Sequence, residues 1–166
     1  QQPHPPIWVA ARSAESIEWC VDHNAPIAQV YQTTDQMEDT FNYYRRVAKE
    51  RGSASGPDKF ILCRHIYVDQ TDEKARAVAE PPLRYFFTLW NRGFNEAKTD
   101  VAVDQRKVKE AMVSTKSFNY FREGNQERVN FHPMSWEQLI ESGFVIAGSP
   151  DTVARQVNQQ MSQIGA

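Results

Sequence analysis

Cysteine is scarce in this sequence: the chain of 166 residues holds two, Cys20 and Cys63, far apart and without a CxxC pair. A disulfide framework is therefore not expected, and a reducing, cytoplasmic setting is favoured. The four histidines show no HxxxH or similar grouping. Because metal sites draw their ligands from such groupings, the sequence predicts no metal centre.

Long apolar runs and an excess of one charge are missing as well. No run approaches the ~18 residues of a membrane span, and no charged segment precedes an apolar one at the start. The formal net charge of −2 gives no reason to expect a nucleic acid or an anionic membrane as partner. No GxSxG elbow is present, so a hydrolase triad has no specific support.

What is present is an alternation of strand and helix patterns. The apolar run 7–11 predicts a strand buried on both faces, and Ser13 follows as the N-cap of a helix that reaches about residue 23. A second strand over 26–31 leads into a helix that starts at 33–36 with a capping-box pattern. The run 60–68 is the longest strand candidate. This alternation favours parallel βαβ units, although periodicity alone fits both doubly wound sheets and barrels.

In the second half of the chain the signals for helix starts and ends are less regular. Thr71 can cap a helix with an acidic first turn, which the pair Pro81–Pro82 is expected to interrupt. Residues 149–151, Ser-Pro-Asp, predict a strong helix start.

Between these segments the chain is polar and mixed. Residues 91–144 are interpreted as an insertion rather than a second domain, since their apolar content is thin. Helical pieces are expected around 105–112 and 136–140.

The first candidate site is the turn formed by Ala11, Arg12, Ser13 and Ser16. It ends a strand and opens a helix, so backbone N–H groups and two hydroxyls could hold a phosphate, with Arg12 adding charge. The alternative is that Ser13 merely caps its helix.

Two strands carry further candidates. Period-2 geometry places Cys63, His65 and Tyr67 on one face, which suits a pocket at a barrel mouth; a hydrogen-bonded core histidine is the alternative. Gln29 and Tyr31 share a face of the preceding strand. They could line a substrate pocket or be ordinary hydrogen-bonded core residues.

Three segments, in order, resemble the bacterial-luciferase-like flavin-dependent monooxygenases. Residues 5–16 are similar to the family's fifth strand and following helix, 60–75 to the seventh strand and its exit, and 148–153 to the start of the helix before the eighth strand. The resemblance implies an α/β fold of the parallel (β/α)8 TIM-barrel type. The chain is shorter than the ~250 residues usual for such a barrel and does not begin with methionine. The resemblance to about strands 5 to 7 and the helix before strand 8 implies that residues 1–166 are the C-terminal portion of the barrel, with a lid-like insertion at about 91–144.

The same resemblance implies an oxidoreductase that uses O2 and reduced FMN, supplied by a separate flavin reductase, to oxidise a small organic substrate through a C4a-(hydro)peroxyflavin. Ser13 and Ser16, with Ala11 and Arg12, would bind the cofactor, and His65 would hydrogen bond or transfer a proton near the flavin. Cys63, Gln29 and Tyr31 would contact the substrate.

The position of Cys63 carries an arginine in alkanesulfonate-oxidising members, so an anionic sulfonate is not the expected substrate. An F420-dependent oxidoreductase on the same barrel is an alternative, and so is a catalytically inert truncated fragment. A homo-oligomer is expected.

Overall fold

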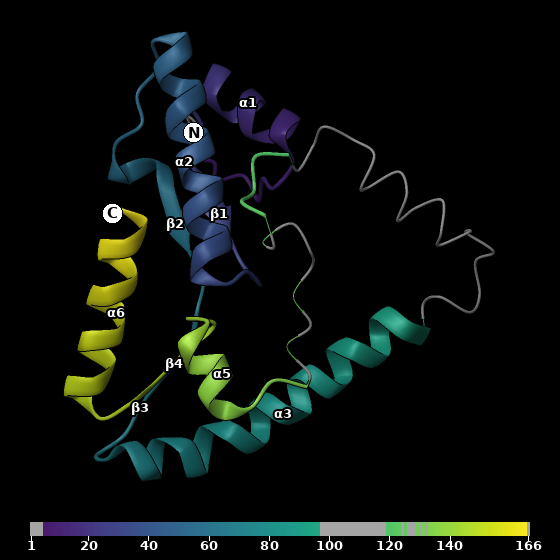
Figure 1. Ribbon diagram of the computed structural model, residues 1–166, viewed down its shortest axis with the longest axis vertical. Coiled ribbons are helices and arrows are strands. Elements are labelled where there is room, and N and C mark those ends of the chain that lie inside the picture. Colours follow the sequence, from purple (N-terminus) through teal and green to yellow (C-terminus); the bar gives the residue numbers. More distant parts are fainter. Residues whose placement is uncertain are drawn as a thin grey trace. The chain divides into compact units, whose positions relative to one another are not determined.

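The computed structural model describes residues 5–96, 119–123, 125, 129, 131 and 133–165 (Figure 1). The chain divides into two compact units. Of the described residues, the first unit contains 5–64, 119–123, 125 and 161–165, and the second contains 65–96, 129, 131 and 133–160. The elements are, in chain order, α1 (Ala14–Asp22), β1 (Ile27–Gln29), α2 (Thr34–Arg51), the 3-10 turn η1 (Pro57–Lys59), β2 (Phe60–Leu62), β3 (His65–Val68), α3 (Asp72–Glu96), α5 (Trp136–Glu141), β4 (Val145–Gly148) and α6 (Pro150–Ile164).

The first unit packs α1 and α2 around a short parallel sheet. Strand β1 pairs with β2 in the register Ile27 to Phe60 through Gln29 to Leu62. Both helices begin as the sequence predicts: the Ser13 hydroxyl caps α1, and Thr33 forms a full capping box on α2. The buried core draws on α1, β1, α2 and the end of α6: Ala14, Ile17, Cys20, Val21, Ile27, Met37, Phe41, Tyr44, Val47, Ala48 and Ile164.

The second unit contains another parallel pair, β3 with β4, in the register His65 to Val145 through Val68 to Gly148. Helix α3 packs beside this pair, and α5 starts with a second capping box at Ser135. The helix expected around 136–140 is thus confirmed as α5. The helical piece expected at 105–112 lies outside the described residues. No helix in the described part of the chain is long and apolar enough to cross a membrane.

The strand expected over 7–11 is wrong in extent and burial. Ile7 and Trp8 are 58% and 63% exposed, and only Val9 pairs, through one parallel bridge to Ile27. An apolar run is buried on both faces only where neighbours cover both faces. Among the described residues, one bridge is all the pairing this run has.

The long strand expected over 60–68 is divided in two. Its first part, β2, pairs with β1, whereas its second part, β3, pairs with β4. Strand β4 was not predicted at all, although all four of its residues are buried. A four-residue apolar run directly after polar sequence gives too weak a periodic signal to be recognised.

The interruption expected at Pro81–Pro82 is also wrong, because α3 runs through both prolines. Each proline removes a hydrogen bond to the carbonyl four residues earlier, here Ala77 and Val78. All four of these residues are exposed, so water can hydrogen bond to the freed carbonyls.

Candidate functional site

The predicted phosphate turn lies at the N-terminus of α1. The Ser13 hydroxyl oxygen accepts from the backbone N–H of Ser16 at 3.2 Å, and the two hydroxyl oxygens lie 2.6 Å apart. The Ser16 hydroxyl also donates to the Ser13 carbonyl at 3.1 Å. The capping role of Ser13 is confirmed, and two hydroxyls stand together at the end of the helix where its dipole favours an anion.

Two side chains from elsewhere in the first unit hold the carbonyls of this turn. Gln29, only 3% exposed, donates from Nε2 to the Ala11 carbonyl. Tyr120 donates its hydroxyl to the Arg12 carbonyl at 2.5 Å. The guanidinium of Arg12 lies over the Phe121 ring, 5.5 Å from its centroid. The turn is therefore supported on its carbonyl side by groups that the helix does not itself supply.

Sequence reasoning did not find Tyr120, which lies in the stretch interpreted as an insertion. It lies 108 residues beyond Arg12 along the chain, and no local spacing pattern links the two. Burial raises the pKa of Tyr120 to about 12. The hydroxyl therefore keeps its proton, and remains a donor, throughout the physiological pH range.

A second serine-led helix start, at α6, is arranged differently. The Ser149 N–H donates to Asp72 Oδ1 at 2.6 Å, and the Thr152 hydroxyl donates to Asp72 Oδ2 at 3.1 Å. The bond from Ser149 holds the pKa of the Asp72 carboxyl below its usual value. A carboxylate of the protein itself thus occupies this helix end.

Gly148 makes that arrangement possible. Its φ of +152° is rarely adopted by other residues, and a Cβ there would meet Thr152 at 2.6 Å and Asp72 Oδ1 at 2.7 Å. A larger residue at this position would force the Thr152 and Asp72 side chains to shift.

His65 lies half-buried in the second unit among phenylalanine rings. Its centroid is 5.2 Å from that of Phe144 and 5.4 Å from that of Phe86. Burial lowers the pKa of His65, so the imidazole is neutral at neutral pH. His65 and Tyr67 share the more buried face of β3, as the spacing predicts, whereas Cys63 lies outside both strands and is exposed.

Gln29 and Tyr31 do not form the shared strand face that the sequence predicts. Strand β1 ends at Gln29, and Tyr31 has a left-handed backbone with φ of 56°, so the period-2 alternation stops between them. Gln29 is committed to the Ala11 carbonyl, and Tyr31 is half-buried.

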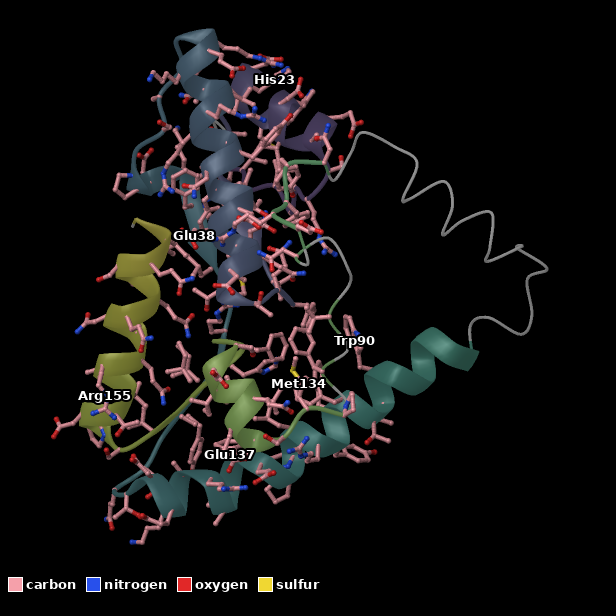
Figure 2. The ribbon with its side chains drawn as sticks, viewed as in Figure 1. His23, Glu38, Trp90, Met134, Glu137 and Arg155 are labelled. Carbon is pink, nitrogen blue, oxygen red and sulfur yellow. The ribbon has the colours of Figure 1, made fainter. Side chains whose placement is uncertain are left out.

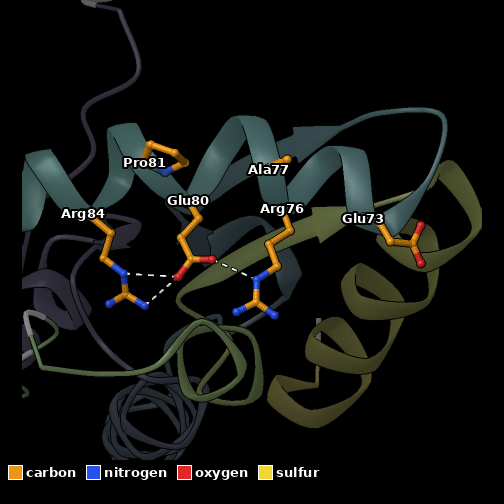
Figure 3. Close-up of a pocket in the computed structure, with 6 residues that line it drawn as sticks. All are labelled: Glu73, Arg76, Ala77, Glu80, Pro81 and Arg84. Carbon is orange, nitrogen blue, oxygen red and sulfur yellow. Dashed lines mark hydrogen bonds and ion pairs between the residues drawn. The ribbon is translucent and has the colours of Figure 1, made fainter.

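A hollow of about 440 Å³ on α3 is lined by Glu73, Arg76, Ala77, Glu80, Pro81 and Arg84 (Figure 3). Glu80 pairs with Arg76 at 2.8 Å and with Arg84 at 2.9 Å. Arg76 also reaches Glu137 of α5 at 2.7 Å, and Arg84 donates to the Met134 carbonyl; both partners are labelled in Figure 2. Since both guanidinium groups are paired with protein groups, this network joins α5 to α3 and does not resemble a ligand site.

In the part of the chain that the structure describes, no three His, Cys, Asp or Glu side chains converge on a point where a metal ion could be held.

Two parallel strand pairs, with helices following β1, β3 and β4, define an α/β protein. The family model described as luciferase-like monooxygenase matches residues 1–166, and the chain belongs to this family.

A curated relative, the oxygenase component of the flavin-dependent trigonelline monooxygenase of Acinetobacter baylyi, is 23% identical over 157 residues. That alignment covers 93% of this chain and 39% of the relative. The chain thus spans about two fifths of that protein's length.

Two solved structures share the fold. The oxygenating constituent of 3,6-diketocamphane monooxygenase from Pseudomonas putida, in complex with FMN, has a TM-score of 0.62 at 18% identity, over 98% of this chain and 40% of that one. The monooxygenase RslO1 of Streptomyces bottropensis has a TM-score of 0.58 at 15% identity, and the match covers 99% of this chain and 40% of RslO1. These likenesses support the α/β, luciferase-like barrel type of fold that the sequence predicts.

Proposed function

We propose that this chain provides the cofactor-phosphate site of a flavin-dependent monooxygenase, and that the phosphate binds at the start of α1. The observation that carries the proposal is the pair of hydroxyls, Ser13 and Ser16, at this helix end. The carbonyls of Ala11 and Arg12 just before it accept hydrogen bonds from Gln29 and Tyr120. Helix N-termini with N–H and hydroxyl donors are ready anion sites. The guanidinium of Arg12 adds a positive charge to the turn.

The choice of α1 over α6 follows from charge. At α6 the carboxylate of Asp72 already accepts from Ser149 and Thr152, and a phosphate there would meet a negative group. At α1 the partners of the two serines are hydroxyl and backbone groups.

Reduced FMN, when bound, would supply the chemistry that activates O2 toward a small organic substrate. Two relatives support the cofactor: one is a flavin-dependent monooxygenase, and the other was solved in complex with FMN. The oxygenase-component name of the first also supports a separate reductase as partner. In this proposal Ala11, Arg12 and the two serines bind the phosphate, and Cys63 and Tyr31 contact the substrate. Gln29, which the sequence also assigns to the substrate, donates to the Ala11 carbonyl and so supports the phosphate turn.

The proposal assigns to His65 the transfer of a proton or a hydrogen bond at the reacting end of the cofactor. Its neutral imidazole, set among phenylalanine rings, can accept a proton at neutral pH. His65→Gln is expected to lower turnover about a hundredfold and to leave FMN affinity within about twofold of wild type. Equal loss of both would count against a role in the chemistry.

We also propose that residues 1–166 are the C-terminal portion of one barrel domain with a lid-like insertion at about 91–144; the share of about two fifths of the relatives' length supports only that the chain matches part of a longer barrel. The decisive experiment therefore uses the full-length protein. It is titrated anaerobically with reduced FMN, with riboflavin, which lacks the phosphate, and with F420. Tighter binding of FMN than of riboflavin is expected; tight binding of F420 alone, or of no flavin, would overturn the proposal in favour of an F420 enzyme or an inert polypeptide.

A further inference from the structure

We infer that residues 119–123 and 125, which we call the clasp, position the phosphate turn, and that Tyr120 is the residue that couples the two. The inference rests on the proposed function, because it concerns the same turn. It assigns Tyr120 a positioning role that acts through the backbone of Arg12 and Ser13.

The coupling runs through one peptide group. In a trans peptide the carbonyl and the following N–H point in opposite directions. The Tyr120 hydroxyl holds the Arg12 carbonyl at 2.5 Å and thereby fixes the direction of the Ser13 N–H. Gln29 does the same at the preceding peptide, since its amide donates to the Ala11 carbonyl.

The clasp is anchored to α2 through a buried carboxylate. Asp39 accepts from the Arg122 N–H at 3.1 Å and from the Asn125 side-chain amide at 2.8 Å. The Arg122 guanidinium pairs with the same carboxylate at 2.6 Å. From the other side, the Gln36 amide donates to the Asn125 carbonyl at 2.8 Å.

Tyr120 itself is held on α2 by stacking. Its ring lies 4.6 Å from that of Tyr43, with an angle of 26° between the planes, and its oxygen is 3.4 Å from the Thr40 hydroxyl. The chain of contacts from Asp39 to the Arg12 carbonyl is therefore continuous. A half-buried donor on a fixed ring orients its acceptor more sharply than water would.

A clasp that only stabilised the fold would affect every flavin alike. A clasp that orients the phosphate turn affects FMN and leaves riboflavin, which lacks the phosphate, unchanged. The ratio of the two dissociation constants therefore separates positioning from bulk stability.

The test is Tyr120→Phe in the full-length protein, with Tyr43→Phe as matched control. Tyr43 belongs to the same stacked pair, but its hydroxyl donates to Glu18 at 2.7 Å and not to the turn. Tyr120→Phe is expected to raise the dissociation constant for FMN about three- to tenfold, the loss of one hydrogen bond, with riboflavin unchanged. Arg122→Ala, which loosens the clasp at its anchor, is expected to give a smaller change of the same kind.

Wild-type binding separates the two ideas. If wild type does not distinguish FMN from riboflavin, the proposed phosphate site fails, and the inference falls with it. If Ser13→Ala abolishes the preference for FMN while Tyr120→Phe retains it, only the clasp inference is overturned. Equal effects of Tyr120→Phe and Tyr43→Phe would also overturn it.

Discussion

The starts of α1 and α6 carry the same local signature and different electrostatics. Each has a serine whose oxygen accepts from the backbone N–H three residues later, and each has a second hydroxyl at that later residue, Ser16 in one and Thr152 in the other. At α6 a carboxylate from α3 completes the arrangement. At α1 the neighbouring charges are those of Arg12 and of Glu15 in the first turn, while the bonds of Ser13 and Ser16 go to hydroxyl and backbone groups and not to a carboxylate. The motif shared by both helices is therefore a helix cap. Whether an anion can also bind at the helix end depends on a residue distant in sequence, which at α6 is Asp72.

The largest effect is expected from making α1 resemble α6. Ser16→Asp places a carboxylate at the helix end where the phosphate is proposed to bind. Like charges in contact cost several kcal/mol, so FMN affinity should fall about a hundredfold while riboflavin affinity changes little. Titration by flavin fluorescence measures both. Thermal stability is expected to hold or rise, because an acid in the first helical turn is favourable; unchanged FMN binding in a folded variant would place the phosphate elsewhere.

A smaller effect is expected from removing one hydroxyl at each helix. Ser13→Ala should weaken FMN binding about tenfold, the loss of a hydrogen bond to a charged group. Ser149→Ala is the control, since the N–H at that helix end already donates to the Asp72 carboxylate. Both variants lose a cap and should be destabilised by about 1 kcal/mol. Equal losses of FMN affinity would abolish the distinction between the two helix ends.

The converse change makes α6 resemble α1. Asp72→Asn removes the negative charge that accepts from Ser149 and Thr152, so the melting temperature is expected to fall while FMN affinity stays the same. Added sulfate should then raise the melting temperature of the variant more than that of wild type, since the helix end has become open to an anion. Equal responses to sulfate would show that Asp72 does not exclude anions from α6.

The smallest effect is a pH dependence confined to α6. Hydrogen bonds hold the pKa of Asp72 below the value of about 3.9 expected in the unfolded chain. The folded protein therefore takes up this proton less readily, and the stabilisation is present above pH ~4 and lost as the pH falls through the folded pKa. The difference in melting temperature between wild type and Asp72→Asn should be constant from neutral pH down to about 5 and shrink below about 4. A constant difference down to the most acid pH would contradict this assignment.

The sequence predicts well those structural features, such as helix caps, that depend on residues close together in the chain. The caps at Ser13, Thr33 and Thr71 follow from side chains that reach N–H groups three residues on. What it missed depends on residues far along the chain: Asp72 lies 77 residues before Ser149, and Tyr120 lies 108 after Arg12.

The misjudged strands and prolines have the same cause. The run 7–11 is apolar enough for a buried strand, but burial depends on neighbours, and the structure records one bridge. Pro81 and Pro82 stay helical because their exposure lets water replace the lost bonds. The strand at Val145–Gly148 became recognisable only through its pairing with β3. His65 was predicted because period-2 spacing places it on one strand face with Cys63 and Tyr67, and its phenylalanine neighbours could not be read from that pattern.

The end of α6 belongs to the first unit, and this has a consequence for the order in which the protein can fold. Arg45 of α2 donates to the carbonyls of Ile164 and Gly165, across 119 and 120 residues, and Ile164 is 1% exposed in the core beside α1 and α2. During synthesis, residues 5–64 emerge before the last turn of α6, so their core cannot be completed until that turn has been made. Contacts of such long sequence separation slow folding. Until then residues 5–64 expose apolar surface that Ile164 would otherwise cover. A chain whose synthesis stops before residue 161 is therefore expected to be prone to aggregation.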